Sequence, residues 1–209
     1  MNEFRRNWAQ KMLDVLRSRE IHEDIGRECS SCQTHSSASL RCQDCFSGPL
    51  LCKNCAVKSH LTNPLHRLEH WNGMFFEPAP LCELGLVWHL GHRGQPCPFS
   101  FNNRTTTLTV LHTTGIHTVA VKYCECLSHN GAAIERPVQL CKVGLWPSSF
   151  SRPQTVFTIH VLKFFSHLTY QAKTPAHDFY GTLRRLTNFP FFDSVKVSAV
   201  QLTTTQSSL

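Results

Sequence analysis

The sequence has no long hydrophobic run. No stretch of about 18 apolar residues occurs in the 209-residue chain, so the sequence offers no transmembrane helix. Its first 20 residues place five arginines and lysines among scattered apolar residues, without the continuous apolar core of a secretory signal. From this pattern we expect an intracellular protein in a reducing compartment and no membrane partner.

Acidic side chains are also scarce. The chain has 14 Asp and Glu residues, and after Glu135 only Asp178 and Asp193 follow. Nuclease chemistry with two metal ions needs several convergent carboxylates, and no strand carries such a set. We therefore expect no nuclease activity from this chain. A hydrophobic content of 41% still favours a folded domain over a disordered one.

Cysteine and histidine are abundant, with 11 and 13 residues. The cysteine density of about 5% lies below that of small disulfide scaffolds. Six cysteines form three Cys-x2-Cys pairs, and two histidines follow them: Cys29/Cys32, Cys42/Cys45, Cys52/Cys55, His60 and His66. In a reducing compartment this spacing is typical of a zinc module. Unligated core cysteines are the alternative, which three regular pairs disfavour.

Eight ligands suffice for two tetrahedral zinc ions, and two pairings are open. Sequential pairing assigns Cys29, Cys32, Cys42 and Cys45 to one ion. Interleaved pairing assigns Cys29, Cys32, Cys52 and Cys55 to one ion, and Cys42, Cys45, His60 and His66 to the other. His35 and His70 are alternative ligands because each is close in sequence to a ligand pair.

A second, looser cluster surrounds the Cys124-x-Cys126 pair, whose side chains share one face of an extended strand. With Cys97 and one histidine this pair makes a third zinc site; His92, His112, His117 and His129 are nearby in sequence. We assign His117, although its seven-residue offset from Cys124 requires a bulge in the strand. Small buried cysteines with surface histidines are the alternative. Cys82 and Cys141 are isolated, and we expect both to fill core space.

Periodicity predicts both helices and strands, and hence an α+β fold. We expect an amphipathic helix over residues 2–20 that packs on its own domain, with Phe4, Trp8, Met12 and Val15 on one face. The other expected elements are a short helix near 81–90, a β-hairpin of 107–112 and 116–124, a strand at 138–140, a buried helix over 155–170, a helix over 178–186 and a poorly ordered tail over 193–209.

The interleaved order with a terminal histidine pair resembles the B-box zinc module, a small cross-braced unit of two strands and a helix. This resemblance covers about 40 residues and fills all eight ligand positions. It implies the interleaved pairing. Together with the elements predicted above, the expected fold is a small cross-braced zinc module that is followed by a β-hairpin and loop region and by C-terminal helices.

A longer ordered set of segments resembles the cysteine-cluster domain that precedes the catalytic domain of Kyakuja–Dileera–Zisupton (KDZ) transposases, which are abundant in mushroom-forming fungi. The form is the CxC2-like cluster. The matching segments are PLHRLEHWNGMFF (64–76), LGLVWHLGH (84–92), GIH (115–117), YCEC (123–126), QL (139–140), WP (146–147), RPQTVFT (152–158) and DFY (178–180). The resemblance runs from about Trp8 to Leu186.

This resemblance implies a zinc-chelating accessory domain that acts in the nucleus, on or near DNA, and lacks the RNase H-like nuclease domain. The chain is then a fragment or relic of an element-encoded protein. Its ligand is DNA, bound weakly and in a salt-sensitive way, or a protein partner, including a second copy; we expect no small-molecule substrate. The formal charge of +7 falls to about +5 when two zinc sites with six thiolates form.

The implied domain limits are an N-terminal helix (1–28), the zinc module (29–72), the rest of the cysteine-cluster domain (73–192) and the tail (193–209). An alternative function is a zinc-dependent hydrolase that uses Cys97, Cys124, Cys126 and a histidine. Catalytic zinc keeps three protein ligands and an open position. No His-Glu-x2-His motif supports this alternative.

Overall fold

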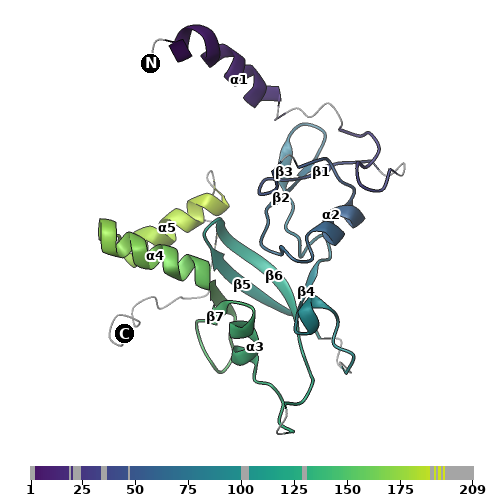
Figure 1. The fold of residues 1–209 in the computed structure, drawn as a ribbon, viewed down its shortest axis with the longest axis vertical. Helices are drawn as coiled ribbons and strands as arrows, with labels where there is room; N and C mark the ends of the chain where they lie inside the picture. Colours follow the sequence, from purple (N-terminus) through teal and green to yellow (C-terminus); the bar gives the residue numbers. More distant parts are fainter. Residues whose placement is uncertain are drawn as a thin grey trace. The chain divides into compact units, whose positions relative to one another are not determined.

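The computed structural model is α+β and contains two compact units, residues 1–85 and 86–209 (Figure 1). It describes residues 3–18, 20, 25–33, 37–46, 48–99, 104–128, 131–188, 191, 193 and 195. Within these residues, no helix combines the length and the apolar character that crossing a membrane requires.

The first unit is built on a three-stranded antiparallel sheet of order β1-β2-β3. Its elements are a π-helical turn (Phe4–Trp8), α1 (Ala9–Ser18), β1 (Leu40–Cys42), α2 (Lys53–Ser59), β2 (Leu68–Trp71) and β3 (Phe76–Pro78). The buried core is small, and its main members are Leu40, Leu50, Leu51, Ala56 and Leu68. Because β3 pairs with β2, this unit extends past the limit at residue 72 that the sequence suggested.

The N-terminal helix forms where the sequence predicts it, but its apolar face is uncovered. None of the residues of α1 is buried, and the side chains of Phe4, Trp8, Met12 and Val15 are exposed. The expectation that this stripe packs on its own domain is therefore wrong for the described residues.

The second unit is built on a five-stranded sheet of order β4-β6-β5-β8-β7 (Figure 1). Its strands are β4 (Val87–Leu90), β5 (Thr106–His112), β6 (Gly115–Tyr123), β7 (Leu145–Pro147) and β8 (Thr155–Thr158). The predicted hairpin is present as β5 and β6, joined at Thr113 and Thr114. Strand β4 runs parallel to β6, and β8 runs parallel to β5.

Helices pack against this sheet and bury its apolar side chains. They are a 3-10 turn (His92–Gly94), α3 (Arg136–Lys142), α4 (Ile159–Ala172) and α5 (Ala176–Thr187). Residues of β5, β6, β8, α4 and α5 share one core, which contains Leu111, Ile116, Phe157, Val161, Phe179 and Leu183. The side chain of Thr158 caps α4 by accepting a hydrogen bond from the Val161 N–H, so the helix begins just after β8.

Three sequence-based assignments differ from the structure. Residues 81–85 form turns and 87–90 form β4, so the helix expected near 81–90 is absent. Residues 138–140 lie inside α3 rather than in a strand. The apolar segment 155–170 begins as strand β8 and becomes helical only at Ile159. Most of the expected tail, 193–209, lies outside the described residues.

Candidate metal centres

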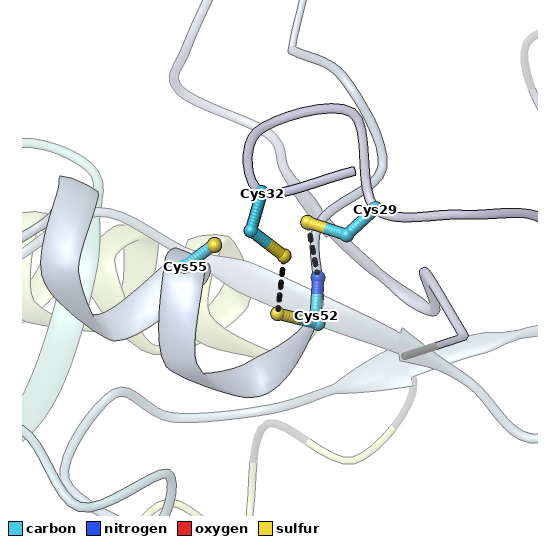
Figure 2. A group of neighbouring side chains, drawn as sticks. All are labelled: Cys29, Cys32, Cys52 and Cys55. Atoms are coloured by element: carbon cyan, nitrogen blue, oxygen red, sulfur yellow. Dashed lines mark hydrogen bonds between the residues drawn. The ribbon is translucent and has the colours of Figure 1, made fainter. Parts of the chain in front are cut away.

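The first Cys/His group consists of four cysteines from two segments of the first unit. Cys29 and Cys32 lie on a turn, Cys52 is the N-terminal cap of α2 and Cys55 lies in the first turn of that helix (Figure 2). The four sulfurs point toward one another and lie within 4.8 Å, with 3.9 Å between those of Cys32 and Cys52. The extended backbone at Cys52 starts the helix and also aims its sulfur at the turn.

Backbone N–H groups stabilise a thiolate in this first group. The N–H of Cys52 donates to the Cys29 sulfur at 3.3 Å. Burial alone would raise the pKa of Cys29, but the N–H groups of Cys52, Cys32 and Ser31 lower this pKa to about 6. The neighbouring thiols instead raise the pKa of Cys55, against the lowering effect of a hydrogen bond with Ser31. A bound cation would relieve this repulsion between the thiols and allow all four to ionise.

The second group contains Cys42, Cys45, His60 and His66, whose ligand atoms also lie within 4.8 Å of one another. Cys42 ends β1, and His60 follows α2. The Cys45 sulfur lies 3.5 Å from His60 Nε2 and 3.4 Å from His66 Nδ1, and the Cys42 sulfur lies 3.5 Å from the same His66 atom. The structure therefore brings the eight residues together in the interleaved order and not in the sequential one.

A hydrogen bond orients His60 of the second group, and the neutral ring is favoured at His66. His60 is buried, and its Nδ1 lies 2.7 Å from the carbonyl oxygen of Ala56. A carbonyl only accepts, so Nδ1 carries the proton and Nε2 presents a lone pair to Cys45. Burial and the nearby His60 lower the pKa of His66, which favours the neutral ring that binds metal.

An ion pair closes the loop of the second group. The guanidinium of Arg67 donates to Asp44 at 2.6 Å from Nη2, and the Arg67 N–H donates to the same carboxylate at 2.7 Å. Asp44 stands between Cys42 and Cys45, and Arg67 follows His66. The pair therefore ties the two ligand segments to each other.

The third group, in the second unit, contains His92, Cys97, Cys124 and Cys126. His92 Nε2 lies 3.3 Å from the sulfurs of both Cys124 and Cys126. The Cys97 sulfur lies 3.7 Å from that of Cys126 and 3.9 Å from that of Cys124. Among the described residues, these four complete the three Cys/His groups that could hold a metal ion.

Strand pairing assembles this third group. In the parallel pair of β4 and β6, Leu90 lies opposite Tyr123, so the residues that follow each strand meet. Gly91 allows the close approach: it has a φ of 147°, and a Cβ there would lie 2.9 Å from that of Cys124. Burial alone would raise the pKa of Cys97, but backbone N–H groups of Glu125 and Phe99 help to lower it to about 6.

The structure places His117 elsewhere, which corrects the histidine that we grouped with Cys97, Cys124 and Cys126. His117 lies near the other end of β6, where its Nε2 is 2.9 Å from Thr114 Oγ1 and its ring is 6.1 Å from that of His112. His92 takes the expected place of His117. It was among the four nearby histidines, but no local pattern distinguished it.

Among the described residues, the candidate ligand His70 lies outside the three groups. His70 lies on β2, 3.9 Å from Glu77, while His35 and His129 lie outside the described residues. Cys82 is half-buried and Cys141 is exposed, so the expectation of core filling is wrong for Cys141.

Donor types and distances in all three groups fit a tetrahedral zinc ion. Zn–S bonds of about 2.3 Å and Zn–N bonds of about 2.0–2.1 Å, at tetrahedral angles, place two sulfurs about 3.8 Å apart and a sulfur and a nitrogen about 3.6 Å apart. In the three groups, neighbouring sulfurs are separated by 3.7–3.9 Å, and sulfurs and neighbouring histidine nitrogens by 3.3–3.5 Å. Thiolate and imidazole ligands select zinc over magnesium or calcium.

A cavity of about 230 Å³ adjoins the third group. His92, Cys97 and Cys124 line it together with His89 on β4 and Lys122 on β6. Burial and the charge of Lys122 lower the pKa of His89, and the two residues lie opposite each other in the β4–β6 pair.

Comparison with known families agrees with this arrangement. A family model described as "CxC2 like cysteine cluster associated with KDZ transposases" matches residues 81–189, just over half of the chain. The chain therefore belongs to the family of CxC2-like cysteine clusters associated with KDZ transposases. The matched span includes the whole third group and none of the first two. No curated protein and no solved structure matches the chain significantly.

Proposed function

We propose that this chain is a zinc-chelating accessory domain of a KDZ-type transposase, which binds DNA or protein and performs no catalysis of its own. The observation that carries the proposal is the presence of three four-residue Cys/His groups with distances that suit tetrahedral zinc. The family match around the third group links this chemistry to transposases. We expect three zinc ions per chain.

Each group offers four protein ligands, which is typical of structural zinc. Zinc at such sites contributes roughly 10–16 kcal/mol of apparent folding free energy in small modules. The first unit has few large buried side chains, so two zinc ions are expected to supply much of its stability. Its interleaved ligands, with β1, β2 and α2 around them, support a B-box-like module.

The placement of acidic residues supports an accessory role. Of the acidic residues in the described part of the second unit, Glu125, Glu135, Asp178 and Asp193, none belongs to a group that could hold a metal ion. Two-metal phosphodiester cleavage relies on such carboxylates. The transposase association favours a nuclear location, and the thiol ligands favour a reducing compartment.

Exposed apolar side chains beside the second group support a protein ligand as one possibility. Phe46 follows Cys45 and is fully exposed, and Leu61 follows His60 and is also exposed. Met74 and Phe75, in the turn between β2 and β3, are exposed as well. Large apolar side chains at the surface are typical of sites that bind a protein partner or a second copy.

A zinc-dependent hydrolase is the second candidate, and the cavity beside the third group is the observation that favours it. His92 opposes this function because it raises the ligand number at Cys97, Cys124 and Cys126 to four, which closes the site. A hydrolase would therefore have to release one ligand to admit water.

Zinc removal and an activity assay test the proposal together. Chelation of the purified full chain should unfold residues 29–70, with fast amide hydrogen exchange there, and re-addition of zinc should restore protection. The zinc-loaded chain should cleave neither DNA with Mg²⁺ or Mn²⁺ nor ester substrates. The proposal would be overturned if the amides of residues 29–70 stayed protected after complete zinc removal. DNA cleavage that is lost on Asp178→Asn would overturn it as well.

A further inference from the structure

The positive charge of the chain is concentrated in its second unit. Residues 1–85 contain ten Lys and Arg and ten Asp and Glu, whereas residues 86–209 contain eleven and four. The whole formal excess of +7 therefore belongs to the second unit. Zinc at the third group, with three thiolates and one neutral histidine, would lower this value by only about 1.

Strand β4 lies at one edge of the five-stranded sheet (Figure 1). Residues at the end of the β4–β6 pair line the cavity beside the third group. His89 and Lys122 lie opposite each other in this parallel pair and both line the cavity. Gln95 adds an amide from the exposed loop that follows the 3-10 turn. Among the described residues that line the cavity, none is acidic.

Two further arginines belong to the same end of the sheet. Arg93 follows His92 in the 3-10 turn, and its side chain is exposed. Arg104 is exposed and precedes β5, where Thr106 pairs with Val121, one residue before Lys122. Both arginines therefore lie at the end of the sheet where the cavity is found, although neither lines it.

We propose that this cavity is a phosphate-binding subsite that holds the backbone of DNA on the second unit. This inference rests on the proposed function, because the third zinc site shapes one wall of the cavity. Lys122 supplies the central cation, His89 and Gln95 supply hydrogen-bond donors, and Arg93 and Arg104 contact neighbouring phosphates. A bound phosphate can accept hydrogen bonds from both His89 and Lys122, which lie opposite each other on adjacent strands.

The size of the cavity and the charge around it favour a polymer over a small ligand. A volume of about 230 Å³ is below the ~300 Å³ at which small-molecule pockets begin. It suits one phosphate group, with the rest of the ligand outside. Exposed Arg93 and Arg104 at the same end of the sheet can contact further phosphates of a polymer, and such contacts make affinity strongly dependent on salt.

Binding of a mixed-sequence DNA duplex to the full, zinc-loaded chain tests the proposal. We expect binding at about 50 mM salt that weakens steeply toward about 200 mM. Lys122→Gln should weaken binding on the order of tenfold and reduce the slope of log affinity against log salt by about 0.9. Lys122→Arg should retain most of the affinity.

Lys163→Gln is the matched control. Lys163 is exposed on α4, away from the cavity, and its loss changes the net charge equally. Zinc content and melting temperature, measured for every variant, identify any variant that fails to fold. His89→Gln is the second cavity variant, and we expect it to lose less DNA affinity than Lys122→Gln. Equal effects of Lys122→Gln and Lys163→Gln would overturn the subsite and leave the accessory function standing.

Two further outcomes separate the ligand sources. Inorganic phosphate at millimolar concentration should shift the NMR signals of His89 only weakly and should compete poorly with DNA. Tight phosphate binding with no DNA binding would overturn the DNA assignment, and so would binding of a protein partner that depends on Lys122 without DNA. Loss of zinc-dependent folding, in contrast, would refute the proposed function itself.

Discussion

Gln139 holds Cys124 by both polar groups of its backbone. The Gln139 Oε1 accepts from the Cys124 N–H at 2.7 Å, and its Nε2 donates to the Cys124 carbonyl at 2.9 Å. The same Nε2 donates to the carbonyl of Ile134. Gln139 is only 5% exposed, so these bonds fix a zinc-ligand segment from a buried position on α3.

Gln139→Leu should loosen the third site. The substitution removes both hydrogen bonds between the Gln139 side chain and the Cys124 backbone. The affinity of the third zinc ion should therefore fall by about 10–100-fold. Titration of the zinc-loaded chain with a chromophoric chelator measures this affinity: one zinc ion per chain should be released at a lower chelator concentration than in the unsubstituted chain. Gln171→Leu, at an exposed position on α4, is the control and should release no ion early. Identical chelator curves for the two variants would refute the role of Gln139.

Histidine substitution distinguishes the two candidates for the third site. His92→Ala should remove the third zinc ion, because Nε2 of His92 contacts the sulfurs of Cys124 and Cys126. His117→Ala should keep all the zinc, because that ring contacts Thr114 and His112. Native mass spectrometry of both variants reads the difference directly. Zinc loss from the His117 variant alone would reverse the assignment.

Double substitutions test the pairing in the first unit. Cys29→Ser with Cys52→Ser should cost one zinc ion, because both belong to the first group. Cys29→Ser with Cys42→Ser should cost two, because each disables a separate group. Cys141→Ser, at an exposed position outside the groups, is the control. If the first double variant lost two ions and the second lost one, the sites would be sequential.

Asp44→Asn should weaken the loop of the second group. The carboxylate accepts from the Arg67 guanidinium and N–H, and its side chain is only 15% exposed. Loss of this charge-assisted pair should cost about 1–3 kcal/mol of local stability. Amide hydrogen exchange in β1 and β2 measures this cost. The control Asp178→Asn, at an exposed position, should change the local stability by less than about 0.5 kcal/mol. Equal effects of the two substitutions would show that the Asp44–Arg67 pair contributes little.

The sequence predicted the elements whose signals are local. Alternating β-branched residues predicted the hairpin of β5 and β6, and the phenylalanine and leucine spacing after Asp178 predicted α5. The interleaved grouping of the first eight ligands followed from a resemblance, since spacing alone left the pairing open. Pro137 at the start of α3 is a local helix signal that outweighs the strand pattern at 138–140, because proline is favoured in the first turn of a helix.

The third group could not be assembled from spacing alone. Its histidine comes from the end of β4, which pairs in parallel with β6 although more than 20 residues separate the two strands. Such long-range pairing leaves no local period, whereas His117 is closer in sequence to Cys124. The boundary between β8 and α4 was also missed. The strand at 155–158 and the helix that begins at Ile159 form one continuous apolar segment, so the sequence pattern predicts a single helix there.

Zinc stoichiometry is the most direct test of the central claim, that three Cys/His groups each hold one zinc ion. Native mass spectrometry of the full chain, purified under reducing conditions with zinc, should show three zinc ions per chain. Each ion should displace thiol protons, because zinc binds cysteine as thiolate. A well-folded chain that carries one zinc ion or none would contradict the account.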